Sequence, residues 1–408
     1  MIERAIKNAL FRIAKSFPVI LVTGARQTGK STLLKNYIQT KGVSYVTFDD
    51  KENILAVRED AKLFMAVHKS PAIFDEIQYV PDLFSYIKMN VDSNRSSGMF
   101  FLTGSQQFSM MKNVSESLAG RVGILNLLPF SQRELASDSF SLPFVPTQEY
   151  ILNRRNSYKS DFSQPDEIWK IIQKGMYPEI CNGNVTTQDF FSSYIRTYIE
   201  RDVRLLTQVA DEMQFMQFIS VAAARTGQLV NYADMARTVG IDPNTAKRWL
   251  SVLVSSGIVY LLQPYFGNVE KRIVKTPKLY FVDTGLAAYL TKWSTPEVLM
   301  NGAMAGNFFE TFAISEMLKS YTNAGIDPPF YFYRDSDGVE VDLLIENNGT
   351  LYPVEIKATS TPKKESAKNF HILNSIKDKK IASGTVICNS SDIGIAAKGV
   401  MTVPVRYV

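Results

Sequence analysis

The sequence is poor in the residues that build disulfides, zinc sites and histidine-based active sites. Among 408 residues there are only two cysteines, Cys181 and Cys388, and two histidines, His68 and His371. Two distant cysteines exclude a disulfide framework and a zinc knuckle, and their scarcity is typical of a reducing cytoplasm. We therefore expect a cytoplasmic protein whose chemistry depends on other side chains.

Long apolar segments and a strong charge of one sign are also absent. The chain contains no uninterrupted apolar run of about 18 residues, the length that a membrane-spanning helix needs. Its first residues lack the basic stretch and apolar run of a secretory signal. The formal net charge of +5 is too small to indicate nucleic-acid binding by itself. We expect no membrane partner, and a length that suits two or three domains.

A glycine-rich motif follows the first apolar, β-branched segment, residues 19–22, which predicts a buried strand. The motif matches G-x-x-x-x-G-K-[ST] and consists of Gly24, Ala25, Arg26, Gln27, Thr28, Gly29, Lys30 and Ser31, with Thr32 opening the next helix. Such a loop turns backbone N–H groups toward phosphate oxygens, and the helix adds the positive end of its dipole. Lys30 can reach the β- and γ-phosphates, and Ser31 can bind Mg²⁺. The motif predicts binding of ATP and Mg²⁺.

Two acidic residues end the apolar segment at residues 71–74. In a P-loop ATPase the first of them, Asp75, would hold Mg²⁺ through water. The second, Glu76, would polarise the attacking water. The pair therefore predicts hydrolysis as well as binding.

Polar residues follow a third apolar segment at residues 99–102. A hydroxyl there could sense the γ-phosphate; Thr103 and Ser105 both qualify, and the sequence does not decide between them. Farther along, Arg121 could stabilise charge on the transferred phosphoryl group, in cis or across a subunit boundary. It could equally be a surface arginine.

These motifs resemble the AAA-like P-loop ATPases of bacteria and archaea. The resemblance rests on residues 24–32, 74–78, 102–105, and 118–121 leading to 128–134, and covers residues 15 to 135. It implies an α/β fold with a parallel sheet and helices on both faces. The carboxylate strand would lie between the P-loop strand and the others. The resemblance implies no substrate.

The middle of the chain has the order of a winged helix. We expect helices at residues 214–225, 232–239 and 243–256, then strands at 258–262 and 278–282. On the third helix the sequence predicts a buried face and a polar face that carries Lys247 and Arg248. The loop between the strands adds Lys271, Arg272, Lys275 and Lys278. This pattern suits a DNA groove and its phosphates, although winged helices also serve as protein-binding or lid modules. Residues 175–179, 198–203 and 278–286 resemble a domain of unknown function often fused behind such ATPases.

Charged residues lie on a helix and two strands that we expect in the last part of the chain. The helix begins near residue 306 and carries Glu310, and the two strands carry Asp342 and the pair Glu355 and Lys357. Residues two apart on a strand face the same way, so Glu355 and Lys357 share a face that a hairpin could bring against Asp342. This pattern resembles the PD-(D/E)XK nucleases, which implies Asp342 and Glu355 as metal ligands, Lys357 as the catalytic lysine and Glu310 as a further acid. Whether this part cleaves is left open.

The sequence thus predicts an ATPase domain at 1–135, an irregular linker at 136–165, a helical and winged-helix domain at 166–295 and a restriction-endonuclease-like α/β domain at 296–408. The favoured function is Mg²⁺-dependent ATP hydrolysis coupled to DNA binding or processing. The alternative is an ATP-gated switch whose winged helix binds a protein partner, its nuclease-like part only a scaffold. In a third interpretation the winged helix contacts its own ATPase domain. A homo-oligomer is a further candidate assembly.

Overall fold

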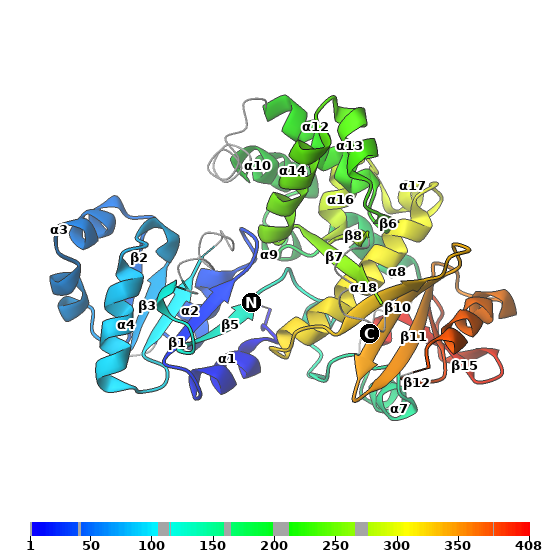
Figure 1. Cartoon of the computed structure of the whole chain (residues 1–408), viewed down its shortest axis with the longest axis horizontal. Coiled ribbons are helices and arrows are strands. Elements are labelled where there is room, and N and C mark those ends of the chain that lie inside the picture. Colours follow the sequence, from blue (N-terminus) through cyan, green and yellow to red (C-terminus); the bar gives the residue numbers. More distant parts are fainter. Residues whose placement is uncertain are drawn as a thin grey trace.

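The computed structural model describes residues 2–39, 42–104, 114, 116–158, 165–198, 212–265, 276–377 and 379–408. These residues form two bodies (Figure 1). The N-terminal domain extends to Leu127, whose side chain packs in the core of that domain. The C-terminal lobe begins with Leu128, which belongs to a separate core that reaches Val408. The border between the bodies therefore falls between two consecutive leucines.

The N-terminal domain is a five-stranded parallel sheet in the order β2-β3-β4-β1-β5. Its strands are β1 (Val19–Thr23), β2 (Ser44–Thr47), β3 (Ala72–Asp75), β4 (Phe100–Thr103) and β5 (Val122–Asn126). Its helices are α1 (Lys7–Ala14), α2 (Lys30–Tyr37), α3 (Lys51–Val67), the short η1 (Ile77–Tyr79) and α4 (Leu83–Asn94). Separate apolar clusters cover the two faces of the sheet. The predicted parallel sheet is confirmed. The expected position of the carboxylate strand is wrong, because β4 lies between the P-loop strand β1 and the carboxylate strand β3.

The C-terminal lobe surrounds a ten-stranded mixed sheet whose main path is β14-β15-β13-β11-β10-β9-β7-β8-β6. The strands are β6 (Gln228–Leu229), β7 (Val259–Pro264), β8 (Lys278–Phe281), β9 (Phe330–Arg334), β10 (Glu340–Asn347), β11 (Thr350–Lys357), β12 (Lys380–Ile381), β13 (Thr385–Cys388), β14 (Gly394–Ala397) and β15 (Val400–Pro404). The helices are α6 (Gln132–Leu135), α7 (Gln148–Ser157), α8 (Pro165–Lys174), α9 (Pro178–Cys181), α10 (Thr187–Tyr198), α12 (Glu212–Ala224), α13 (Tyr232–Val239), α14 (Pro243–Ser255), α16 (Thr284–Leu290), α17 (Pro296–Met300), α18 (Ala305–Asn323), η3 (Lys364–Ser375) and η4 (Val405–Tyr407).

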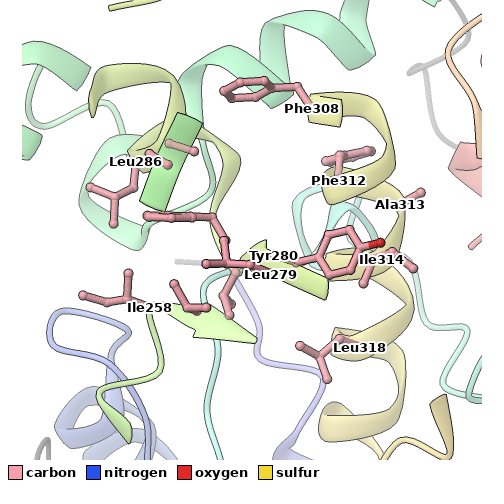
Figure 2. Close-up of a cluster of buried hydrophobic side chains, with 14 of the residues drawn as sticks. Ile258, Leu279, Tyr280, Leu286, Phe308, Phe312, Ala313, Ile314 and Leu318 are labelled. Carbon is pink, nitrogen blue, oxygen red and sulfur yellow. The ribbon is translucent and has the colours of Figure 1, made fainter. Parts of the chain in front are cut away.

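The sheet crosses the boundary that the sequence suggested at residue 295. Strand β7 pairs in parallel with β9, with Gln263 opposite Tyr331 and Pro264 opposite Phe332. Helix α18 packs on this sheet, and Figure 2 draws Phe312 and Leu318 of α18 and Leu279 of β8 in one cluster of buried side chains. The two predicted C-terminal domains therefore share one core, in which fully burying one such side chain is worth about 1.5–3 kcal/mol.

The predicted irregular linker is largely structured. Helix α7 falls inside residues 136–165, where the sequence indicated an irregular connection, and α6 lies directly before them. Phe144, Tyr150 and Arg154 are buried, and Arg154 pairs with Asp138 at 2.5 Å. Other contacts join this stretch to distant residues, since the backbone N–H of Phe144 donates to Ser320 Oγ at 3.0 Å, and such contacts cannot be read from a serine-rich composition.

Helix-capping residues explain why the predicted helices in the middle of the chain form where they do. Asp242 accepts hydrogen bonds from the backbone N–H groups of Asn244 and Thr245 at 2.9 and 3.0 Å, and Pro243 occupies the first turn of α14. Gly240, with φ of 78°, ends α13. A side-chain acceptor before a helix and a left-handed glycine after it satisfy the unpaired backbone groups at helix ends. These local signals were readable in the sequence.

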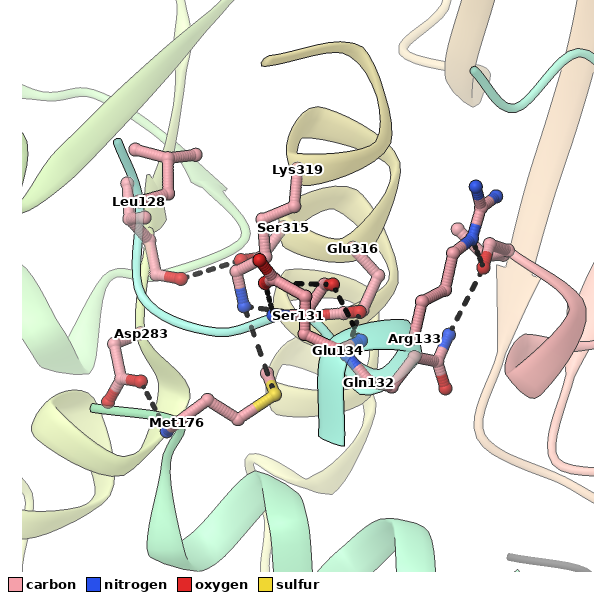
Figure 3. A network of polar contacts seen from close by, with 12 residues as sticks. Leu128, Ser131, Gln132, Arg133, Glu134, Met176, Asp283, Ser315, Glu316 and Lys319 are labelled. Atoms are coloured by element: carbon pink, nitrogen blue, oxygen red, sulfur yellow. Dashed lines mark hydrogen bonds and ion pairs between the residues drawn. The ribbon is translucent and has the colours of Figure 1, made fainter. Parts of the chain in front are cut away.

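A buried polar network joins the two bodies. Arg4 of the N-terminal domain pairs with Glu134 at 3.1 Å. Two residues before it, the backbone N–H of Gln132 donates to Glu316 of α18 at 2.7 Å, and Glu316 pairs with Lys319 at 2.8 Å (Figure 3). All these charged side chains are at most 8% exposed. Buried charges are costly unless paired, so this network fixes how the bodies meet.

Candidate functional site

The phosphate-binding motif forms a tight loop between β1 and α2. Gly24 has φ of 145°, and a Cβ there would lie 2.1 Å from the Leu127 carbonyl oxygen, so only glycine fits. Gly29 adopts a left-handed conformation directly before the first residue of α2, Lys30. Residues 26–32 line a cavity of about 570 Å³. The loop thus ends at a helix N-terminus that faces an open space large enough for a small ligand.

Hydroxyl groups hold the carboxylate of Asp75 in front of this loop. Ser31 donates a hydrogen bond to Asp75 Oδ1 at 2.8 Å, and Thr103 donates to the same oxygen. Lys30 donates to the carbonyl oxygens of Gly24 and Ala25 at 3.2 and 2.8 Å. Asp75 is 4% exposed. The structure therefore brings Ser31, Asp75 and Thr103 together.

Glu76 occupies an unusual backbone conformation at the edge of the same cavity. Its φ is 57°, which is rare for a residue with a side chain. Its backbone N–H donates to Thr103 Oγ1 at 3.0 Å, and Gln78 donates to Glu76 Oε2 at 2.5 Å. Thr103 thus contacts both acidic residues, whereas Ser105, the other candidate, lies outside the described residues. Such strained residues cluster at functional sites.

Arg121 does not belong to this cavity. It precedes β5, whose first residue pairs with Val19 at the beginning of β1. Arg121 therefore lies at the N-terminal ends of the strands, whereas the phosphate-binding loop follows the C-terminal end of β1. Its guanidinium pairs with Asp92 of α4 at 2.6 Å. The strands thus separate Arg121 from the loop of its own chain, and this placement gives no support to a role in cis. A role across a subunit boundary stays a prediction.

The C-terminal lobe supplies one wall of the cavity. Its lining includes Pro178, Glu179 and Asn182 from α9 and its end, and Tyr194 and Thr197 from α10. Sequence reasoning missed these residues as site residues. The motif at residues 175–179 marked the region, but no spacing connects it with a loop some 150 positions earlier.

The two bodies also touch at the loop itself. A Cβ at Gly257, just after α14, would lie 3.3 Å from the Ala25 backbone nitrogen. The turn after α14, the helix whose polar face was predicted to suit a DNA groove, therefore packs against the phosphate-binding loop. This contact agrees with the interpretation in which the helical module meets its own ATPase domain.

The residues present fit ATP and Mg²⁺. Mg²⁺ prefers oxygen ligands and often takes a serine hydroxyl and a carboxylate besides phosphate oxygens; Ser31 and Asp75 offer both within 2.8 Å of each other. Phosphates would meet the N-terminus of α2 and Lys30. The remaining cavity, between Phe130, Tyr37 and Tyr194, offers room and aromatic surface for a base.

A second cluster of charged side chains lies in the C-terminal lobe. The β10–β11 hairpin pairs Leu343 with Val354 and so brings Asp342 against Glu355. Lys357 lies 2.7 Å from Glu355 Oε1 and 3.8 Å from Asp342 Oδ2. The hairpin thus brings together the three strand residues that the sequence singled out.

Glu310 joins this cluster with partners that the sequence did not suggest. Lys278 donates to Glu310 at 2.7 Å and to Glu340 at 2.8 Å, and Tyr280 donates to Glu310 at 2.5 Å. The sequence placed Lys278 among the basic residues of an exposed wing, but it is 3% exposed. That prediction was wrong, because Lys278 begins β8 and its ammonium is buried between Glu310 of α18 and Glu340 of β10.

The electrostatics of the cluster follow from its burial. Burial, and then the neighbouring Asp342 charge, raises the pKa of Glu355 to about 8. Burial likewise raises the pKa of Glu310. Glu355 Oε2 is buried without a hydrogen-bond partner. In the described part of the chain, no three acidic, histidine or cysteine side chains are arranged to share one metal ion; Asp342 and Glu355 would be the two ligands available.

The predicted DNA-contacting residues divide into two groups. Lys247 and Arg248 are exposed on α14, and Ala246, Trp249 and Leu250 on the other face are buried, as the pattern predicted. The wing residues Lys271, Arg272 and Lys275 lie outside the described residues.

Among the helices within the described ranges, none combines the length and the hydrophobicity needed to cross a membrane.

The fold and the site of the N-terminal domain define a P-loop ATPase domain of the AAA class. A model of an AAA domain matches residues 16–136. Two models of domains of unknown function follow, DUF8612 at residues 165–297 and DUF4143 at residues 305–408. The chain belongs to the family of the uncharacterized proteins Mb2031c of Mycobacterium bovis and Rv2008c of Mycobacterium tuberculosis. It is 30% identical to each over 368 residues, which is 89% of this chain and 75% of theirs.

Solved structures resemble the chain more loosely. The Walker-type ATPase PABY2304 of Pyrococcus abyssi is 13% identical, with a TM-score of 0.44, over 71% of this chain and 96% of that one. The RuvB Holliday junction branch migration motor of Thermotoga maritima is 16% identical, with a TM-score of 0.25, over 62% of this chain and 88% of that one.

Proposed function

We propose that this protein is a Mg²⁺-dependent ATPase in which the C-terminal lobe responds to the state of the nucleotide. The observation that carries the proposal is the composition of the 570 Å³ cavity, which the P-loop lines on one side and α9 and α10 on the other. A ligand between two bodies favours the arrangement in which both contact it. ATP binding and hydrolysis would therefore change how the lobe sits on the ATPase domain.

Each residue of the ATPase site has a chemical task in this proposal. Lys30 and the N–H groups at the start of α2 bind phosphate oxygens, and Ser31 and Asp75 hold Mg²⁺, which supplies charge neutralisation at the phosphates. Glu76 accepts a proton from the attacking water at its carboxylate. Thr103 fixes the positions of the two acidic residues relative to each other, because its hydroxyl donates to the carboxylate of Asp75 and accepts from the backbone N–H of Glu76.

Steady-state ATP hydrolysis by the full chain in Mg²⁺, beside the Glu76→Gln variant, tests the catalytic part. We expect turnover in the wild type and a loss of about 100-fold or more in the variant, with ATP binding retained. If both proteins bind ATP and neither turns it over, the assignment of Glu76 is wrong or a partner completes the site.

Hydrogen exchange tests the response of the lobe. Peptides that contain α9 and α10 should exchange more slowly when ATP is added to the wild type, and should not change in Lys30→Ala. Asn182→Ala should weaken ATP binding about fivefold, the value of one hydrogen bond. Asn301→Ala, just after α17 and outside the cavity lining, is the matched control. Equal exchange with and without ATP would contradict a nucleotide-responsive lobe.

A second candidate function is DNA processing by the C-terminal lobe. Under it, α12–α14 with β7 and β8 form a winged helix, and the cluster around Asp342 and Glu355 forms a nuclease-like centre. The observation that favours it is a carboxylate pair with a single cation: Asp342 and Glu355 both contact Lys357. A divalent cation would offset the remaining negative charge of this pair and bind the unpartnered oxygen of Glu355.

Two measurements separate this candidate from a purely regulatory lobe. The ATPase rate is measured with and without duplex or single-stranded DNA, and cleavage of the same DNA is measured with Mg²⁺ or Mn²⁺ in the wild type and Asp342→Ala. DNA-stimulated ATPase with cleavage lost in Asp342→Ala supports processing. An unchanged ATPase rate and no cleavage support the switch, with a protein as the partner of α14.

A further inference from the structure

A tyrosine on the neighbouring strand completes the shell around the metal-binding carboxylate. Tyr45 lies on β2, opposite Ile73 of β3, and its hydroxyl donates to Asp75 Oδ2 at 2.7 Å. Ser31 and Thr103 take the other oxygen, Oδ1. Hydroxyl groups from three separate elements therefore hold both oxygens of Asp75.

Helix α2 fixes the tyrosine as well as the carboxylate. Lys35 lies four residues after Ser31, on the same side of α2, and its ammonium is 4.1 Å from the centre of the Tyr45 ring. A cation over the ring attracts its π electrons and limits the positions that the ring can adopt. One helix face thus supplies Ser31 to Asp75 Oδ1 and positions the group that binds Oδ2.

The Tyr45 hydroxyl is suited to donate a lasting hydrogen bond. Burial, and then the hydrogen bond with Asp75, raises the pKa of the phenol above its usual value. The hydroxyl therefore keeps its proton near neutral pH and can donate its hydrogen bond there. Rotation of the carboxylate would break at least one of its three hydrogen bonds.

We propose that Tyr45 is a positioning residue for the metal site: its hydroxyl holds Asp75 in the one orientation in which Oδ1 faces Ser31. The proposal rests on the ATPase function proposed above. Tyr45 does not line the cavity, so it acts through Asp75 and not on the nucleotide. Losing the Tyr45 hydroxyl should weaken the binding of Mg²⁺ more than the binding of the nucleotide.

The test compares Tyr45→Phe with the wild type in two titrations. In the first, ATPase activity is measured against free Mg²⁺; in the second, a fluorescent ATP analogue is bound with Mg²⁺ and with EDTA. We expect the Mg²⁺ concentration for half-maximal activity to rise about tenfold, because Asp75 loses the hydrogen bond that orients it. Binding in EDTA should stay unchanged, which also shows that the variant is folded.

Tyr86→Phe is the matched control, because Tyr86 of α4 packs beside the core of the same domain and away from the cavity. An equal Mg²⁺ dependence in Tyr45→Phe and Tyr86→Phe would overturn the proposal. If the wild type binds the analogue but does not hydrolyse ATP, the ATPase proposal fails on its own. The Mg²⁺ dependence of analogue binding then still decides the role of Tyr45: a rightward shift supports it, and no shift rejects it.

Discussion

The two acidic sites of this protein hold their carboxylates in different ways. At the ATPase site, Asp75 accepts hydrogen bonds from the hydroxyls of Ser31, Tyr45 and Thr103. In the C-terminal lobe, lysines contact the carboxylates directly, as Lys357 does with Glu355. A hydroxyl orients a carboxylate and leaves its charge in place, whereas an ammonium neutralises much of it. The ATPase site thus keeps the full charge of its carboxylate for a cation, whereas lysines in the lobe cluster already offset part of the charge.

The difference also separates two uses of burial. Asp75 sits beside an open cavity, and its orientation serves a ligand. Glu310 of α18 and Lys278 of β8 meet between the helix and the sheet, and their pairing serves the fold. Removing one partner of a buried ion pair leaves an uncompensated charge, which costs about 3–5 kcal/mol. Substitutions at the two sites should therefore separate activity from stability.

The largest effect is expected at the ATPase site. Lys30→Ala should reduce ATP hydrolysis about 100-fold or more, because the lysine binds the phosphates and stabilises charge in the transition state. The free energy of unfolding should change far less. ATPase assays and urea denaturation of the same preparations measure both. A stable variant that keeps its activity would remove the basis for assigning Lys30 to the nucleotide.

Lys278→Met should mainly destabilise the lobe. It leaves Glu310 and Glu340 without their shared cation, at a cost of about 3–5 kcal/mol, measured by urea denaturation. Lys247→Met on exposed α14 is the control and should stay within about 0.5 kcal/mol of the wild type. If Lys278→Met is as stable as its control, the cluster is not a structural ion pair, and the contrast between the two sites breaks down.

Glu355→Gln should alter the pH dependence of stability. Because the folded-state pKa of Glu355 is raised to about 8, the folded chain binds more protons than the unfolded chain between pH 4.5 and 8. The contribution of this group to the free energy of unfolding therefore falls as the pH rises through that window. The slope of this contribution against pH is at most about 1.4 kcal/mol per pH unit.

The measurement is urea denaturation of wild type and Glu355→Gln at several pH values between about 5 and 8, inside the window that the raised pKa defines. The variant should lose less stability across this range. Added Mg²⁺ should flatten the wild-type curve if a cation binds Asp342 and Glu355. Parallel curves for the two proteins would show that Glu355 does not titrate in this window.

The smallest effect is expected for Arg121→Ala. Its partner Asp92 and the opposite edge of the sheet keep it from the cavity of its own chain, so the ATPase rate of the monomer should not change. The rate is measured over a range of protein concentrations. A large fall that appears only at concentrations where the wild type assembles would assign Arg121 to a neighbouring subunit's site.

Local patterns in the sequence predicted much of the ATPase site. A buried strand, a glycine-rich loop and a helix N-terminus are consecutive, so Gly24, Gly29 and Lys30 could be assigned from their spacing. The same holds for the capping of α14 by Asp242 and for the hairpin that joins the strands of the second acidic cluster. Between Thr103 and Ser105 the sequence could not choose, and the contacts of Thr103 with both acidic residues favour the first.

Other features depend on contacts between distant segments. Tyr45 reaches Asp75 because β2 and β3 are neighbours, and α9 reaches the P-loop because a buried network docks the lobe. Lys278 looked like part of an exposed wing and became the buried partner of Glu310. No spacing rule connects such residues, because side-chain burial and pairing arise only when separate elements pack.

Local sequence patterns predicted the P-loop, its two acidic residues and many of the helices and strands, since these follow from periodicity, glycine positions and capping over a few residues. They could not show that the two C-terminal parts share one sheet, that Arg121 lies across the sheet from the nucleotide cavity or that the lobe supplies one wall of this cavity. The physical reason is that short-range backbone preferences are written in neighbouring residues, whereas the packing of distant surfaces depends on the whole fold.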